Sequence, residues 1–244
     1  MKERWKRLVL LLVLCGCNPW QAFLSANPRS CEQNPGICQV GEVCNPQTRL
    51  CEKSEMLSLV AGGLGGFGSL DNTGAAARFG APSGVAVDGA GNLYVADSVN
   101  HTIRQVVTST GVVTTLAGTA GMSGSTDGTG AAARLHGPTG VAVDGAGNLY
   151  VADSDNNTIR KVVASTGAVT TLAGTAGMEG STDGTGAAAR LYGPIGVTID
   201  GAGNLYVAEA FNSTIRKVVT STGVVTTLAG TAGMRGSADG TGAA

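Results

Sequence analysis

The chain is poor in the side chains on which many enzymes and nucleic-acid-binding proteins depend. Only two of its 244 residues are histidines, and aromatic residues make up 4% of the sequence. His101 and His136 occupy non-equivalent positions of the repeat described below, so a histidine-rich metal centre is not expected. The scarcity of aromatic rings argues against a stacking surface for bases or sugars. We expect neither a metal nor a cofactor.

The net charge is close to zero, and common catalytic motifs are absent from the sequence. The 16 basic residues are balanced by 17 acidic residues, which leaves no electrostatic footprint for nucleic acid. The sequence contains no HExxH, GxSxG or P-loop pattern. Catalysis and nucleic-acid binding are therefore not expected.

Glycine is abundant, with 39 residues, and the chain is built from a repeat of 56 residues. Two complete copies, 82–137 and 138–193, differ at 8 of 56 positions, and the incomplete copy 194–244 differs from the middle copy at 11 of 51. A period near 50 that consists of short β-prone runs is typical of stacked sheets such as those of a propeller.

One repeat predicts four strands, here called a, b, c and d, at about 141–144, 148–153, 158–163 and 168–173. Strands c and d are rich in Val, Ile and Thr, and a glycine-rich turn, DGAGN, joins a to b. A polar linker of about twenty residues leads from strand d to the next strand a, and its AAARL segment predicts one helical turn. The expected class is all-β.

The motifs GxVTTLAG, GSxDGxGxAARL, PxGVAVDGAGNLYVAD and NxTIRKV resemble bacterial NHL repeats over about residues 57–244. The resemblance implies a β-propeller and a binding surface, without a particular ligand. We expect an NHL-repeat region over 56–244 with three four-stranded blades, plus a leading strand d near 57–61.

Three blades are too few for a closed ring, since propellers have four to eight. The chain is then a fragment of a longer array, one half of a homodimer that forms a six-bladed ring, or an open arc. We favour the fragment, because the sequence ends within a motif, at ADGTGAA.

The amino terminus predicts export. Residues 1–16 combine basic residues with the apolar run LVLLLVL, which is typical of a signal peptide and too short to span a bilayer. The following Leu-Cys-Gly-Cys resembles a bacterial lipobox, so Cys17 is the expected lipidated residue, followed by a spacer over 17–30. Asn18 favours the outer membrane or cell surface over the inner membrane. The alternative is an ordinary cleaved signal and free secretion.

A small module over 31–55 follows, with cysteines at 31, 38, 44 and 51. In an exported chain, Cys31, Cys38, Cys44 and Cys51 predict two disulfides, whose three connectivities the sequence leaves open. Zinc is the competing interpretation, but the spacings lack CxxC pairs.

Several charged residues recur once per repeat. Asp97, Asp153 and Glu209 end strand b, and we expect them to accept N–H bonds from the following turn rather than to bind calcium. Arg104, Arg160 and Arg216 recur in strand c, with Asp71, Asp127 and Asp183 as possible structural partners. The alternative for these arginines is anion binding.

Most differences between copies fall at one end of the strands. In a four-stranded blade the d–a and b–c connections lie on one face, which we call the variable face. The candidate ligand-binding residues on it are Val99, His101, Ser123, His136, Asp155, Asn157, Glu179, Tyr192, Phe211, Ser213 and Arg235. The pattern predicts a non-catalytic scaffold at the cell envelope that binds a protein or another extracellular ligand. The alternatives are a propeller lyase or hydrolase whose catalytic residues lie in missing blades, a truncated copy without selected function, and neutral drift on the loops.

Overall fold

The computed structural model describes residues 42–44, 51–53, 59–63, 66–237 and 239–242. The chain divides into two compact units, Met1–Leu59 and Val60–Ala244. In the first unit, β1 (Glu42–Cys44) pairs antiparallel with β2 (Cys51–Lys53), and Cys44 stands opposite Cys51 in the register. The predicted signal peptide, Cys17, Cys31 and Cys38 lie outside the described residues.

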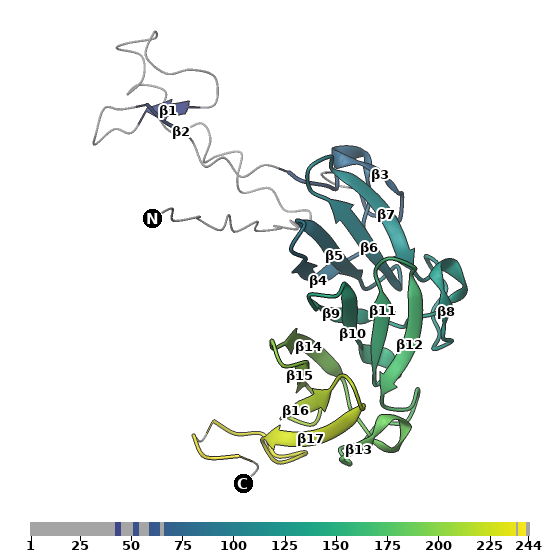
Figure 1. Ribbon diagram of the computed structural model, residues 1–244, viewed down its shortest axis with the longest axis vertical. Coiled ribbons are helices and arrows are strands. Elements are labelled where there is room, and N and C mark those ends of the chain that lie inside the picture. Colours follow the sequence, from purple (N-terminus) through teal and green to yellow (C-terminus); the bar gives the residue numbers. More distant parts are fainter. Residues whose placement is uncertain (1–41, 45–50, 54–58, 64–65, 238, 243–244) are drawn as a thin grey trace. The chain divides into compact units, whose positions relative to one another are not determined.

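The second unit contains three antiparallel sheets, one per repeat, as the sequence predicts (Figure 1). The first comprises β4 (Pro82–Val87), β5 (Asn92–Asp97), β6 (Thr102–Val107) and β7 (Val112–Ala117). The second comprises β9 (Pro138–Val143), β10 (Asn148–Asp153), β11 (Thr158–Val163) and β12 (Ala168–Ala173). The third comprises β14 (Pro194–Ile199), β15 (Asn204–Glu209), β16 (Thr214–Val219) and β17 (Val224–Ala229).

Each sheet has five strands, so the expectation of four-stranded blades was wrong. The additional strands are β3 (Asn72–Thr73), β8 (Gly128–Thr129) and β13 (Gly184–Thr185), which pair with β7, β12 and β17 respectively. These strands lie in the linker. The sequence does not predict them, because two residues are too few to show an alternating pattern. Their pairing covers the edge of strand d.

The linker also holds the predicted helical turn, slightly earlier than expected. Short 3₁₀ turns occupy η1 (Gly74–Ala76), η2 (Gly130–Ala132) and η4 (Gly186–Ala188), and η3 (Ser154–Asn156) lies in the second b–c connection. The expected leading strand does not form over residues 59–61, and 57–58 lie outside the described residues.

The core lies between consecutive blades. Tyr94, Ala96 and Ile103 of the first sheet pack with Leu149 and Val151 of the second. The second and third sheets repeat this arrangement 56 residues later. Each blade therefore buries apolar side chains against its neighbours, as expected when one sheet cannot form a core alone.

Candidate functional site

The d–a and b–c connections meet on one face of the blades, which places the variable face as expected. A carboxylate at the end of each strand b joins the two connections: Asp97 Oδ1 accepts hydrogen bonds from the N–H groups of Gly80 and Ala81, at 2.7 and 3.0 Å. The expectation that these carboxylates accept from the backbone N–H groups of the turn after strand b was wrong for Asp97. The actual donors precede strand a, because the carboxylate points across to the neighbouring connection.

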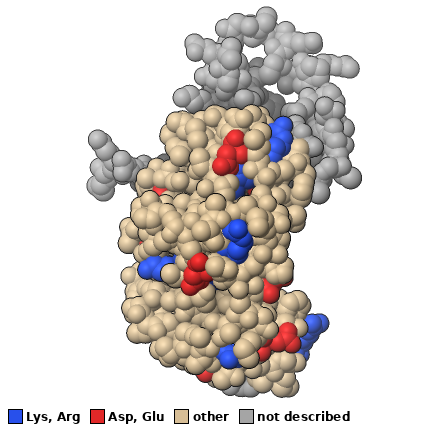
Figure 2. Space-filling view, turned by 90° about the vertical axis from the view of Figure 1, so that its right-hand side faces the viewer, with Lys and Arg blue, Asp and Glu red and all other residues tan. Residues whose placement is uncertain are grey.

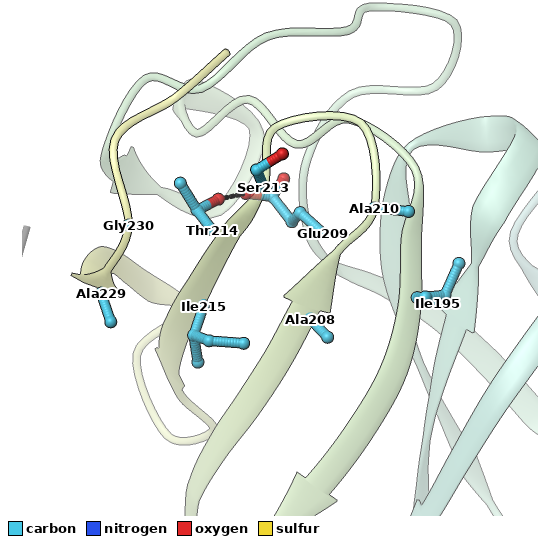
Figure 3. A pocket seen from close by; sticks show the side chains of 9 residues that line it. All are labelled: Ile195, Ala208, Glu209, Ala210, Ser213, Thr214, Ile215, Ala229 and Gly230. Carbon is cyan, nitrogen blue, oxygen red and sulfur yellow. Dashed lines mark hydrogen bonds between the residues drawn. The ribbon is translucent and has the colours of Figure 1, made fainter. Parts of the chain in front are cut away.

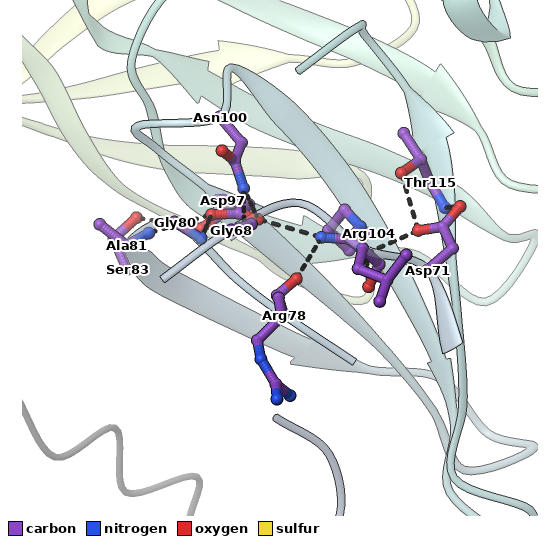
Figure 4. Close-up of polar contacts among 12 residues, drawn as sticks. Gly68, Asp71, Arg78, Gly80, Ala81, Ser83, Asp97, Asn100, Arg104 and Thr115 are labelled. Carbon is purple, nitrogen blue, oxygen red and sulfur yellow. Dashed lines mark hydrogen bonds and ion pairs between the residues drawn. The ribbon is translucent and has the colours of Figure 1, made fainter. Parts of the chain in front are cut away.

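The same carboxylate is part of a buried ion pair (Figure 4). Asp97 Oδ2 accepts from Asn100 Nδ2 at 2.7 Å and from Arg104 Nη1 at 3.2 Å. Arg104 Nη2 also donates to Asp71 Oδ1 at 2.6 Å, and Asp71 accepts from the N–H of Thr115. The arginines of strand c are fully buried and paired, so their role in the described structure is to tie strands b, c and d to the linker.

Burial has an electrostatic cost in this network. It raises the pKa of Asp153, although hydrogen bonds from Asn156 and the N–H of His136, and the charge of Arg160, act in the opposite direction. The network is structural, and it fixes the connections from which the candidate binding residues project.

The junction between the first and second blades brings both histidines together. The His101 and His136 rings lie 5.4 Å apart, centroid to centroid, and His136 Nε2 is 3.6 Å from Asp155 Oδ2. A comparison of equivalent positions of the repeat does not reveal this contact, because the junction joins non-equivalent positions.

The junction between the second and third blades has the same backbone arrangement but different side chains. Tyr192 and Phe211 replace His136 and Asp155, and their ring centroids are 4.8 Å apart. At both junctions the linker backbone runs close to the side chain of the b–c connection. A Cβ at Gly137 would collide with the Asp155 carboxylate, and a Cβ at Gly193 with the Phe211 ring. Both glycines also have positive φ, 56° and 59°.

Three of the candidate residues share an unusual backbone conformation, and two of them bond to the next linker. His101, Asn157 and Ser213 adopt left-handed backbone conformations with φ between 55° and 59°. His101 Nδ1 accepts from the N–H of Gly137 at 3.1 Å, and Asn157 Oδ1 accepts from that of Gly193 at 2.8 Å. The side chains of His101 and Asn157 thus join neighbouring blades.

The exposed candidates are those at the tips of the b–c connections and in the linkers. They are Val99, Ser123, Asp155, Glu179, Phe211 and Arg235, while His136 and Tyr192 are half-buried beside them. Figure 2 shows one side of the molecule, on which basic and acidic residues lie scattered and form no large patch of one sign. That side therefore carries no broad electrostatic field of one sign.

The described residues contain no group of three His, Cys, Asp or Glu arranged to hold a metal ion. In the described part of the chain, no helix is long and apolar enough to cross a membrane.

A comparison with known protein families identifies two of the repeats that form the blades. A family model described as the NHL repeat matches residues 79–106 and 135–162, which run from the linker through strand c of the first two blades. The chain contains NHL repeats. Its sheets are thus blades of the β-propeller type, and the variable face is the loop face of these NHL blades.

Relatives carry NHL repeats within much longer chains. Human NHL repeat-containing protein 2 is 33% identical over 208 residues, which cover 79% of this chain and 29% of that protein. The Arabidopsis thaliana protein SUPPRESSOR OF QUENCHING 1, chloroplastic, is 37% identical over 148 residues, 57% of this chain and 14% of that protein. The chain therefore spans less than a third of the curated relatives it matches.

Solved structures with a similar fold include a protein from Bacteroides thetaiotaomicron. This protein, of unknown function, superposes with a TM-score of 0.54 at 24% identity, over 72% of this chain and 41% of that chain. This similarity shows the fold alone.

Proposed function

We propose that the chain is a non-catalytic scaffold that binds a protein or another extracellular ligand through the variable face of its NHL blades. The supporting observation is that consecutive junctions share the same backbone arrangement but present different side chains on the variable face. The imidazole–carboxylate pair of His136 and Asp155 at one junction becomes the aromatic pair of Tyr192 and Phe211 at the next. Repeat proteins form binding surfaces in this way, with a constant scaffold and varied loop tips.

The a–b turns on the opposite face support this assignment by their uniformity. Each a–b turn has the sequence Asp-Gly-Ala-Gly-Asn. In each turn the aspartate accepts hydrogen bonds from the backbone and side chain of the asparagine and from a tyrosine hydroxyl, for example Asp144 from Asn148 and Tyr150. These turns have the same structural role in each blade, whereas most of the residues that differ between the two complete copies lie on the variable face.

We also propose that the scaffold is held at the bacterial cell envelope by lipid on Cys17, with the outer membrane or the cell surface as its place. The proposal is supported by the basic and apolar segment before Leu14-Cys15-Gly16-Cys17. Mass spectrometry of the protein purified from membranes tests it. An acylated terminal peptide that begins at Cys17 is expected, and an unmodified terminus at another residue would contradict it.

Site-specific photo-crosslinking tests the binding face. A photoreactive amino acid is placed at Phe211, which is exposed, or at Ala202, an exposed residue of the a–b turn on the opposite face. The full chain is then irradiated in cells that produce it. Adducts of defined mass are expected from position 211 and not from position 202. Equal adducts from both positions, or from position 202 alone, would contradict the proposal.

A further inference from the structure

On the variable face, neighbouring blades are joined by the same hydrogen bond with a different acceptor at the two junctions. Gly137 N–H donates to His101 Nδ1 at 3.1 Å, and, 56 residues later, Gly193 N–H donates to Asn157 Oδ1 at 2.8 Å. Both acceptor residues have a left-handed backbone, with φ of 57° and 55°. One geometry therefore uses an imidazole nitrogen at the first junction and an amide oxygen at the second.

The third blade has a serine at the equivalent position. Figure 3 shows Ser213 beside Thr214 in that b–c connection, and a φ of 59° gives Ser213 the same left-handed backbone. Histidine is the side chain that changes charge between about pH 5 and 8, whereas an amide and a hydroxyl stay uncharged. Of the three equivalent positions, the one that holds His101 can therefore respond to a mild change of pH.

Protonation of His101 removes the acceptor at the first junction. A backbone N–H can only donate, so Nδ1 of His101 accepts through its lone pair, and the proton of the neutral ring lies on Nε2. In the imidazolium ion both ring nitrogens carry hydrogen, and the N–H of Gly137 then faces a second N–H. A partly buried donor without an acceptor is costly, so the contact holds with the neutral ring and opens with the charged one.

Two titratable side chains face His101 from across the junction. The ring of His136 lies 5.4 Å from that of His101, centroid to centroid, and His136 Nε2 is 3.6 Å from Asp155 Oδ2. The pair of His136 and Asp155 ties the linker to the second blade and does not reach the first. When both rings are charged, two like charges meet across the junction, and their repulsion adds to the loss of the hydrogen bond to Gly137.

The other charged groups on the elements around His101 have partners of their own. Arg134 Nη1 donates to two carbonyl groups of its own linker, at 2.6 and 2.7 Å. The others are the buried ion pairs Asp97–Arg104 and Asp153–Arg160. The segment 118–122, whose Gly118 lies against the carbonyl of His101, has no ionisable side chain.

The linker that carries His136 is held from both sides on the variable face. On one side His101 accepts from Gly137, and on the other the N–H of Asp155 donates to the His136 carbonyl at 3.2 Å. Loss of the His101 contact releases the side toward the first blade, while Leu135 stays fully buried in the core between the blades. The expected change is therefore local to the variable face and does not separate the blades.

We infer that the hydrogen bond between His101 and Gly137 is a pH-sensitive contact, closed near neutral pH and open in mild acid, through which the pH of the surroundings controls ligand capture at the junction of the first two blades. The inference deepens the proposed function and rests on it for the effect on capture. The hydrogen bond between Asn157 and Gly193 is its uncharged counterpart in the same molecule.

Hydrogen exchange of the two glycine amides, measured by NMR on the full chain, tests the contact. Protection factors, which correct for the intrinsic pH dependence of exchange, are compared at about pH 7.5 and about pH 5, since histidine changes charge between these values. The protection of Gly137 is expected to fall about tenfold in acid relative to that of Gly193. An unchanged ratio of the two protection factors would overturn the inference.

Two substitutions, each taken from the second junction, assign the effect to one ring. His101→Asn introduces the acceptor of the second blade, which tolerates a left-handed backbone, and it is expected to keep Gly137 protected at both pH values. His136→Tyr is expected to leave the pH dependence in place, because Nδ1 of His101 still gains the proton. Acid exposure of Gly137 that persists in His101→Asn, or that disappears in His136→Tyr, would show that another group is responsible and overturn the inference.

Photo-crosslinking separates this inference from the proposed function. A photoreactive amino acid at Val99, an exposed residue of the same b–c connection as His101, is compared with one at Phe211 in intact cells at the same two pH values. Adducts from position 99 are expected to decrease in acid relative to those from position 211, and His101→Asn is expected to prevent the decrease. With adducts from position 211 present, an equal decrease in wild type and His101→Asn would overturn this inference alone. Absence of adducts from both positions at neutral pH would contradict the proposed function, whatever the Gly137 amide shows.

Discussion

The guanidinium of Arg160 donates a hydrogen bond to Asp153 across 2.8 Å, and both side chains are 0% exposed. The second Nη group of Arg160 donates to Asp127 at 2.7 Å, so one side chain joins strands b and c to the linker. The other two blades repeat this arrangement with Arg104 and Arg216. A charged residue at the centre of each blade is tolerated because its charge is paired twice.

Arg160→Met is expected to destabilise the protein by about 3–5 kcal/mol, because it leaves Asp153 buried and without its partner. Urea unfolding, followed by circular dichroism, measures the change. The matched control is Lys161→Met, at the next position of the same strand, which is expected to change the free energy of unfolding by less than about 0.5 kcal/mol. Equal effects of the two variants would contradict a structural role for the pair.

Glu209→Asp is expected to destabilise the third blade by about 1 kcal/mol. The longer side chain of Glu209 reaches Thr214 Oγ1 at 2.8 Å as well as Arg216. With aspartate at the equivalent position, Thr102 Oγ1 and Thr158 Oγ1 are buried without a hydrogen-bond partner. The urea midpoint tests this, and the reciprocal variant Asp153→Glu, which offers Thr158 an acceptor, serves as the comparison. An unchanged midpoint for Glu209→Asp would contradict the prediction.

The a–b turns predict a dependence of stability on acid. Hydrogen bonds from the side chain and N–H of Asn204, and from Tyr206 and the N–H of Ala202, lower the pKa of Asp200 to about 2. A carboxyl group with a depressed folded-state pKa stabilises the protein above its unfolded pKa, about 3.9, and this contribution is lost as the pH falls toward 2.

Wild type is therefore expected to be more stable than Asp200→Asn above about pH 4, with the difference shrinking as the pH falls to 2. Thermal unfolding of both proteins across this range measures it. A difference that stays constant down to pH 2 would show that the carboxylate charge is not what stabilises the turn.

Phe211→Ala and Asp155→Ala are expected to weaken ligand capture and to leave the melting temperature almost unchanged, because both side chains are exposed tips. Phe211→Ala also removes the ring contact with Tyr192, worth about 0.5–1.5 kcal/mol, so its melting temperature is expected to fall by only a few degrees. Capture at wild-type strength by the double variant would contradict the assignment of the variable face.

The backbone of the first unit predicts one disulfide. Cys44 and Cys51 are directly opposite in an antiparallel pair, where Cα atoms are about 4.5–5.5 Å apart, within the range that a disulfide spans. We predict a Cys44–Cys51 bond, which leaves Cys31 for Cys38. Peptide mapping without reduction of the exported protein tests this, and a Cys31–Cys51 peptide would contradict it.

Local patterns were sufficient to predict most of each blade. The runs of β-prone residues, such as Thr158–Val163, and the glycine-rich turns specify strands and hairpins through contacts a few residues apart. The strands b, c and d were confirmed, and strand a begins earlier than predicted, at Pro138. The two-residue strand β8 was missed, because only its pairing with β12 makes it a strand.

The sequence by itself determined the 56-residue repeat, the all-β blades and the face on which the copies differ. Only the tertiary structure decided which of the differing residues meet. His101 accepts from Gly137, 36 residues later, and Ser83 donates to the carbonyl of Thr139, 56 residues later. Such contacts arise when one blade packs against the next, so they depend on the geometry between repeats, which no pattern within a repeat contains.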